Sequence, residues 1–262
     1  VPETIRIEIN GELPANVMSK DVILRIIGDL TAAGATYRAL EFTGDTVEAM
    51  SLSSRMTMAN MGIEAGAKCA LFAPDEKTAE YLGIELTAAE RALAGDADAP
   101  CARVLRYCAE DFVPVMALPS NVDHVAAIRD LEPVAIDQVF LGSCTNGRLE
   151  DLMAAAEILK GKHIAPFVKL IVTPASRKIW EEAEANGTLA TLSAAGAMIT
   201  HPSCGLCCGR TGGILSDGER VVATNNRNFL GRMGSSKVEI YLASPKSAAA
   251  SALTGRLTEA PC

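Results

Sequence analysis

Aromatic side chains are scarce in this chain: Phe, Tyr and Trp make up only 4% of its 262 residues. The core must therefore be packed mostly by Ala, Val, Ile and Leu. Enough of these are available, because hydrophobic residues account for 49% and charged residues for 21%, a globular rather than a disordered composition. The length suits one large domain or two domains of ordinary size.

Long apolar runs and basic runs are also missing. No apolar stretch reaches the ~20 residues that a helix needs to cross a bilayer, and we expect no signal peptide at the start. The formal charge is −8, and the lack of a basic run argues against nucleic acid as a partner. Local arginines can still bind an anionic substrate in an acidic chain.

Eight cysteines occur in a chain without a secretory pattern, which favours metal binding or chemistry over a disulfide framework. We therefore expect a reducing, cytoplasmic compartment. The first residue is Val1 rather than Met. This predicts a processed product, an expressed fragment or a piece of something longer.

Strand-like and helix-like segments alternate through most of the sequence, which predicts an α/β fold with a largely parallel sheet in the second half. The expected strands are 5–10, 38–42, 69–72, 137–142, 169–173, 197–200, 221–224 and 238–242. The expected helices are 21–30, 46–67, 149–159, 175–186 and 245–253, with a helix-rich polar stretch at 76–110. Ser19 or Asp21 is the expected N-cap of the first helix.

The pattern loosens over residues 112–119, which contain two prolines and show no helical period. We place a domain boundary at about residue 115. The predicted domains are therefore 1–115 and 116–262.

Two cysteine-containing segments each follow a predicted strand. They are Gly-Ser-Cys-Thr-Asn-Gly at 142–147 and His-Pro-Ser-Cys-Gly-Leu-Cys-Cys-Gly at 201–209. Open α/β sheets bind ligands at the carboxyl ends of their strands. Cys144 precedes a predicted helix, whose N-terminus favours the thiolate form that a metal requires. Cys204 and Cys207 have the C-x-x-C spacing that lets one loop hold two corners of an iron–sulfur cluster.

Three cysteine ligands would leave one iron of a cluster open to substrate as a Lewis acid. From spacing alone, a tetrahedral zinc site that includes Cys208, or a redox C-x-x-C pair with Cys144 merely buried, is an equal alternative. Adjacent cysteines rarely fit one metal, so we favour Cys144, Cys204 and Cys207 as ligands and Cys208 as a bystander. An electron-transfer protein would need a fourth ligand, for which only Cys208 is nearby.

Three motifs occur in order: Ser-Cys-Thr-Asn-Gly-Arg-Leu-Glu-Asp-Leu at 143–152, the Cys-Gly-x-Cys loop, and Asn-Arg-Asn-Phe-Leu-Gly-Arg-Met-Gly at 226–234. Together they resemble the aconitase family, in particular its 3-isopropylmalate dehydratase and homoaconitase large subunits. Similarity at 20–24, 60–67, 172–176 and 241–245 extends the resemblance over nearly the whole chain. It implies two three-layer α/β domains and a [4Fe–4S] cluster on Cys144, Cys204 and Cys207.

The resemblance also implies roles for polar residues. In this family the Asn-Arg-Asn-Phe-x-Gly-Arg segment faces substrate, so Arg227 and Arg232 are expected to act in substrate binding and catalysis. Asn226 is expected in the cluster or substrate environment. Without the resemblance, the two arginines would more simply be surface residues, although a guanidinium fork does suit a carboxylate.

A second segment, Asn-Met-Gly-x-Glu, lies at the cluster in this family. Asn60 and Glu64 are four residues apart and share a face if they lie on one helix. The resemblance implies that Glu64 assists the hydroxyl or water on iron and that Asn60 orients it. Taken alone, they would be an ordinary solvated stripe. His124, His201 and Trp180 are expected to be structural.

Other parts of the family's enzymes are not recognisable here. The Asp-Ser-His-Thr stretch of the family's N-terminal domain does not occur, and neither does the small swivelling domain that supplies the base. We therefore expect the second and third domains of a four-domain hydro-lyase, incomplete and inactive alone, with that N-terminal domain and a small subunit as partners. The expected substrate is 3-isopropylmalate, in leucine biosynthesis. Homoaconitate, a methylated malate, or a non-catalytic cluster-binding fragment are the alternatives.

Overall fold

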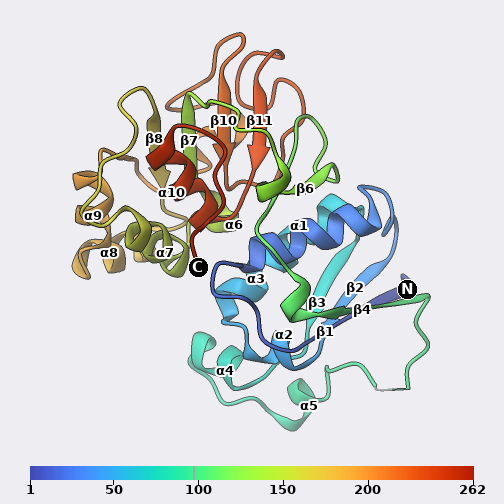
Figure 1. The fold of residues 1–262 in the computed structure, drawn as a ribbon. Coiled ribbons are helices and arrows are strands. Elements are labelled where there is room, and N and C mark those ends of the chain that lie inside the picture. Colours follow the sequence, from blue (N-terminus) through green and yellow to red (C-terminus); the bar gives the residue numbers. More distant parts are fainter. Residues whose placement is uncertain (97) are drawn as a thin grey trace.

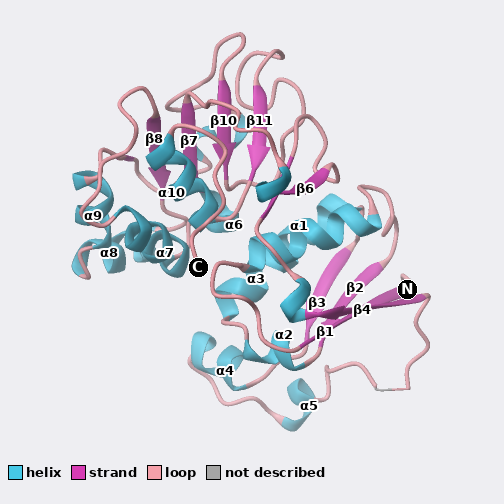
Figure 2. Ribbon diagram, in the orientation of Figure 1, coloured by secondary structure: helices cyan, strands magenta, loops and turns pink. Residues whose placement is uncertain are grey.

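The computed structural model describes residues 1–96 and 98–262 and contains two β-sheets with helices packed around them (Figure 1, Figure 2). The first sheet has the order β3-β2-β1-β4 and is parallel throughout. The second has the order β6-β5-β11-β10-β7-β8-β9, and only the pairs that involve β5 are antiparallel. The predicted α/β class, with a largely parallel second sheet, is confirmed.

The first sheet consists of β1 (Thr4–Asn10), β2 (Ala39–Thr43), β3 (Cys69–Phe72) and β4 (Arg103–Cys108). The second consists of β5 (Val115–Ala117), β6 (Val125–Ala127), β7 (Gln138–Gly142), β8 (Lys169–Thr173), β9 (Met198–Ile199), β10 (Arg220–Ala223) and β11 (Glu239–Leu242).

The helices of the first half are α1 (Ser19–Leu30), α2 (Asp45–Ala49), α3 (Leu52–Met61), α4 (Glu76–Leu82) and α5 (Ala88–Arg91). Those of the second half are α6 (Ser143–Asn146), α7 (Leu149–Leu159), α8 (Arg177–Ala185), α9 (Thr188–Ala194) and α10 (Pro245–Thr254). Short 3₁₀ turns are η1 (Gly62–Ala65), η2 (Ala109–Asp111), η3 (Ile128–Asp130) and η4 (Gly205–Cys208). In the described part of the chain, no helix combines the length and the apolar character needed to span a membrane.

Strict alternation in β1 determines which face of the first sheet is buried. Ile5, Ile7 and Ile9 have at most 2% of their surface exposed, while Arg6 and Glu8 point to the opposite face. The isoleucine face packs in one hydrophobic cluster with the apolar residues of α1. Figure 1 shows α1 and α3 on the side of this sheet that faces the second sheet.

The second sheet lies between two hydrophobic clusters. Val139 and Leu141 of β7 belong to a cluster with α7, α9 and α10, whereas Phe140 belongs to the cluster that also contains the first sheet. Strands buried on both faces are typical of parallel sheets and explain the continuous apolar run of β7. The loops after these strands can therefore only emerge at the ends of the sheet.

Several predicted elements differ from the structure. The helix expected over 46–67 is broken, because Met50 has an extended backbone (ψ 144°) and the Ser51 hydroxyl caps a new helix by accepting from Ser54 N at 3.0 Å. The helix-rich stretch at 76–110 ends in β4, which pairs with β1; residue 97 of this stretch lies outside the described residues. The loosened stretch at 112–119 contains β5.

The cap of α1 is also not the predicted one. Met18 occupies the N-cap position, so Ser19 and Asp21 both lie inside the helix. Asp21 instead accepts from Met18 N at 2.9 Å and from Val115 N at 3.1 Å. The carboxylate therefore ties the start of α1 to the first strand of the second sheet.

The chain passes from the first sheet to the second between Cys108 and Val115. A single hydrophobic cluster nevertheless contains residues of both sheets, among them Ile7 and Leu242. The two-domain division at residue 115 stays a prediction.

Candidate functional site

The candidate cysteines and the segment with Asn226, Arg227 and Arg232 lie at the carboxyl ends of parallel strands. Cys144 lies in α6 directly after β7, and the loop with Cys204 and Cys207 follows β9. The segment 224–232 follows β10, the neighbour of β7. Because these strands run parallel, their carboxyl ends meet at one edge of the sheet, where ligands bind in open α/β folds.

Glycine determines how the chain leaves β7 toward Cys144. Gly142 has φ +143°, and a Cβ at this position would lie 2.1 Å from the carbonyl oxygen of Thr173 on β8. A side chain is therefore excluded here by contact as well as by conformation. The next turn is held from the first half of the chain, because Thr57 Oγ1 donates to Thr145 O at 2.9 Å.

The second cysteine segment is a 3₁₀ turn in which Cys207 N donates to Cys204 O at 3.0 Å. Cys207 is buried, whereas Cys204 and Cys144 are exposed. The eight cysteines are all free thiols. The adjacent Cys208 is half-buried.

The cysteine thiols share one electrostatic environment. The pKa of Cys204 is raised first by partial desolvation and then by Cys208, Cys207 and Cys144, while Arg232 acts in the opposite direction. Neighbouring thiolates disfavour deprotonation of the Cys204 thiol, whereas the cationic Arg232 favours it. Within residues 1–96 and 98–262, no three His, Cys, Asp or Glu side chains form a site for a single metal ion.

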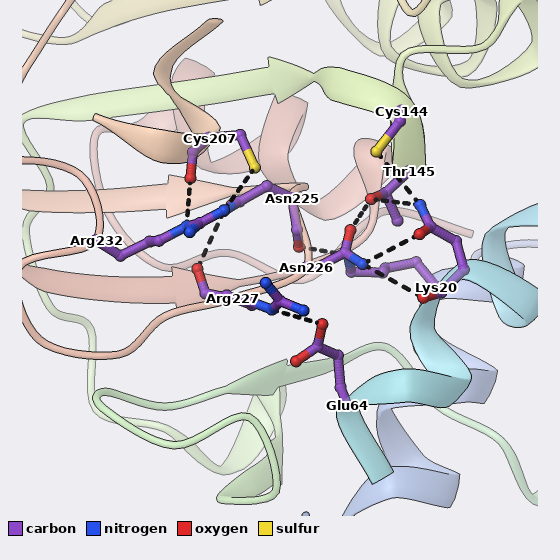
Figure 3. A network of polar contacts seen from close by, with 10 residues as sticks. Lys20, Glu64, Cys144, Thr145, Cys207, Asn225, Asn226, Arg227 and Arg232 are labelled. Carbon is purple, nitrogen blue, oxygen red and sulfur yellow. Dashed lines mark hydrogen bonds and ion pairs between the residues drawn. The ribbon is translucent and has the colours of Figure 1, made fainter. Parts of the chain in front are cut away.

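Polar hydrogens point at two of the sulfur atoms. Asn60 Nδ2 lies 3.5 Å from Cys144 Sγ, and Arg232 Nη2 lies 3.7 Å from Cys207 Sγ. Arg232 Nε also donates to Cys207 O at 2.7 Å, as Figure 3 shows. Hydrogen bonds to sulfur are one of the means by which a protein tunes an iron–sulfur cluster.

Asn226 lies beside Cys144 through a network of amide and hydroxyl groups. Its Oδ1 accepts from Thr145 Oγ1, and its Nδ2 donates to Asn60 Oδ1 at 3.4 Å. Asn60 Nδ2 in turn donates to Thr145 Oγ1 at 3.2 Å. The network joins α3 to the segments after β7 and β10.

Glu64 and Arg227 form an ion pair at the edge of this network, with Arg227 Nε 2.8 Å from Glu64 Oε1 (Figure 3). The Glu64 side chain is only 10% exposed, whereas that of Arg227 is 41% exposed. Asn60 lies in the last turn of α3 while Glu64 lies in η1, so they do not share one continuous helix as expected. Both side chains still reach residues of the segment after β10.

Three residues near the site were not assigned from the sequence. Thr145 and Arg148 lie within the quoted motif, and Arg148 Nη2 donates to Cys144 O at 3.2 Å. Lys20 has no exposed surface, and its ammonium contacts Thr224 O and Asn225 O. Burial lowers the pKa of Lys20 to about 7. The available signal was the segment 20–24, which begins with Lys20 and carries part of the resemblance.

The remaining candidates lie elsewhere. His124 and His201 are exposed, and Trp180 packs against the hydrophobic cluster around α7. A cavity of about 1160 Å³ lies between α2–α3 and α7–α9 and is lined by Ser51 and Glu150 among others. None of the predicted site residues lines it.

Comparison with known proteins adds a family. The chain matches the family model described as "Aconitase family (aconitate hydratase)" over residues 1–134 and 121–255. It is 49% identical over 259 residues to "3-isopropylmalate dehydratase large subunit 1" of Methanopyrus kandleri. It is 46% identical over 260 residues to "3-isopropylmalate dehydratase large subunit 2" of Archaeoglobus fulgidus. Both alignments cover 99% of this chain but 62% of the relative, so the chain spans less than two thirds of their length.

Proposed function

The chain belongs to the aconitase family, and on this premise we propose that it is the cluster-bearing portion of a hydro-lyase large subunit that dehydrates 3-isopropylmalate in leucine biosynthesis. The proposal rests on three free thiols in the segments after β7 and β9 and on the Glu64–Arg227 ion pair, whose arginine lies in the segment after the neighbouring strand β10. The names of the relatives support the substrate. Homoaconitate and a methylated malate are the alternative substrates.

Cys144, Cys204 and Cys207 would hold a [4Fe–4S] cluster. The donor set fits, because the thiols are free and the Asn60 amide and the Arg232 guanidinium point N–H groups at two of the sulfur atoms. When bound, the cluster supplies a Lewis acid with an open coordination position.

Arg227 would bind a substrate carboxylate. Its Nε is engaged by Glu64 at 2.8 Å, which fixes the guanidinium plane while the two Nη groups stay available for a bidentate contact. The partial exposure of its side chain supports access from solvent. Arg232 would fix a second carboxylate beside Cys207.

Glu64 would handle the proton of the departing hydroxyl. Its carboxylate is mostly buried and is held in place by Arg227, so it has a defined orientation. A carboxylate within hydrogen-bond reach of the hydroxyl oxygen is what general acid–base catalysis requires. Asn60 and Asn226 would orient groups between Glu64 and Cys144 through their shared hydrogen bonds.

The proposed enzyme needs further polypeptides. The relatives are named "large subunit", which supports a small subunit as partner, and they are longer than this chain. We propose that the small subunit brings the base that removes the carbon-bound proton and that an N-terminal domain completes the large subunit. A cytoplasmic location follows from this biosynthetic role. The second candidate is a cluster-binding protein without activity of its own.

Reconstitution tests the proposal. The chain is loaded with iron and sulfide without oxygen, counted for both elements, and examined by electron paramagnetic resonance. It is then combined with a small subunit and an N-terminal domain from a relative. We expect four irons per chain and turnover of 3-isopropylmalate only in the full mixture. Turnover by the chain alone would contradict the assignment of the base, and a loaded but inactive mixture would favour the second candidate.

A further inference from the structure

Lys20 connects the first half of the chain to the site. It lies in the first turn of α1, has no exposed surface, and its Nζ donates to Thr224 O at 2.9 Å and to Asn225 O at 2.7 Å. Within the described residues, no carboxylate lies within ion-pair distance of this ammonium. The buried ammonium therefore binds two backbone carbonyls.

Those carbonyls lie directly after β10, at the start of the segment that carries Asn226 and Arg227. Thr224 Oγ1 accepts from Gly142 N at 2.9 Å, immediately before the turn that carries Cys144. Asn225 Nδ2 donates to Arg227 O at 3.0 Å, whereas Asn225 Oδ1 is buried without a hydrogen-bond partner among the described atoms. In Figure 3, Lys20 lies close to Asn225 and Asn226.

Burying an ammonium group in a protein interior is energetically unfavourable. Removing a charge from water costs several kcal/mol unless good hydrogen bonds compensate, and an apolar side chain of similar volume often stabilises a fold equally well. Charge-assisted hydrogen bonds are short and directional, however, and fix the groups that accept them. The distances of 2.7 and 2.9 Å at Lys20 are of this kind.

We propose that Lys20 is a positioning residue whose ammonium clamps the Thr224–Asn225 carbonyls and thereby sets Arg227 against Glu64. The clamp acts from the first half of the chain on the second, on the segment after β10, in addition to the Thr57–Thr145 contact on the segment after β7. The consequence for substrate binding rests on the proposed function; the consequence for the Arg227–Glu64 pair does not.

The test uses Lys20→Met, which keeps the length of the side chain and removes the ammonium. The readout is the Nε–H resonance of Arg227 in the nitrogen-15-labelled full chain without metal or substrate, assigned by its loss in Arg227→Lys. We expect Lys20→Met to move this resonance to the position of a free arginine. Lys77→Met is the matched control, because Lys77 Nζ also holds backbone carbonyls, those of Glu48, Ala49 and Met50 at 2.5–3.0 Å, outside the site.

A purely structural Lys20 would lower the melting temperature and leave the Arg227 resonance of the folded protein in place, and that result would overturn the proposal. If Lys20→Met does not fold, Lys20→Gln replaces it, since the shorter amide reaches one carbonyl and should move the resonance part of the way. An unmoved resonance in that variant would also overturn the proposal.

The assembled enzyme provides the second arm. There, Lys20→Met should lower kcat/KM on the order of 10–100-fold, mainly through KM, because a misplaced arginine binds the carboxylate less well. A moved resonance without any activity in the parent enzyme would leave the clamp standing and contradict the proposed function instead.

Discussion

The cysteines of this chain have different neighbours, so single substitutions can test their roles one at a time. Cys144 and Cys207 each have a side-chain N–H group near sulfur, from Asn60 and Arg232. Cys208 is half-buried, with its Sγ 4.0 Å from Gly205 O.

We predict that Cys144→Ser, Cys204→Ser and Cys207→Ser each prevent cluster assembly, whereas Cys208→Ser does not. A serine hydroxyl is a far poorer ligand for iron than a thiolate. Visible absorbance and an iron count after anaerobic reconstitution measure the outcome, with the exposed Cys69→Ser as control. Cluster loss in Cys208→Ser together with retention in Cys144→Ser would show that the ligands are wrongly assigned.

Arg232 donates a hydrogen bond to the Cys207 carbonyl and is also expected to bind a substrate carboxylate. We predict that Arg232→Lys in the assembled enzyme costs ~2–4 kcal/mol in kcat/KM, because lysine lacks the planar fork. Steady-state kinetics measure this. Arg220→Lys is the control, because Arg220 pairs with Glu239 at 2.8 Å on β10 and β11; an equal loss in both variants would contradict a specific role.

At the scale of elements, the end of β7 is the most constrained point of the site. We predict that Gly142→Ala lowers the free energy of unfolding by about 3 kcal/mol or more, because overpacking adds to a strained backbone. Cluster loading should fall with it. Denaturant unfolding gives the number.

Gly161→Ala is the matched control for Gly142→Ala. Gly161 also has a positive φ of +70°, but no atom lies within 4 Å of a Cβ built there. It should therefore cost only about 1 kcal/mol, from backbone conformation alone. A similar cost at both positions would mean that contact with Thr173 O is not what requires glycine at 142.

Asp21, in the first turn of α1, should make the stability of the fold depend on pH. Burial raises the pKa of Asp21 to about 7 from its ordinary 3.8, and Met18 N, Val115 N, the Ser244 side chain and Lys20 only partly oppose this. Between these two pH values the folded state holds a proton that the unfolded state releases. The free energy of unfolding should therefore fall as the pH rises from about 4 to 7.

Asp21→Asn tests this dependence, because an amide does not titrate. The stability of the wild type relative to Asp21→Asn should be greatest near pH 4 and decline toward pH 7, as measured by urea unfolding at each pH. Lys20 does not mask the effect, since its pKa is lowered to about 7 from 10.5 and its contribution changes above this window. A relative stability that rises with pH would contradict the prediction.

At the scale of the whole molecule, one hydrophobic cluster holds residues of both sheets, including Ile7, Phe42, Phe140 and Leu242. We predict one cooperative unfolding transition rather than two. Trp180 lies in α8 and reports on the second half by fluorescence, while far-ultraviolet circular dichroism reports on both halves. The two signals should have the same midpoint.

A substitution in the first sheet sharpens this test. Ile7→Ala should cost about 2–5 kcal/mol and lower the midpoint reported by Trp180 as much as the midpoint from circular dichroism. A Trp180 midpoint that does not move would show that the halves unfold separately and would favour two independent domains.

Local patterns in the amino-acid sequence were sufficient for the α/β class, for most strands and for the family, which the family match confirms. Alternation in β1 and the apolar run in β7 are consequences of burial on one face and on two faces, so they can be read from consecutive residues. The pairing of β4 with β1 could not be read, because its partner lies nearly a hundred positions earlier. The break at Met50–Ser51 was also missed, because no glycine or proline marks it in the sequence.

The sequence by itself determined which side chains were available to the site: three cysteines at strand ends, two arginines, and the Asn60–Glu64 pair. Only the tertiary structure decided how they meet. Glu64 reaches Arg227 across 163 positions of sequence, and Lys20 reaches Thr224 across 204. Such contacts depend on how two sheets pack through a shared core, and packing is a property of the whole chain that no local spacing records.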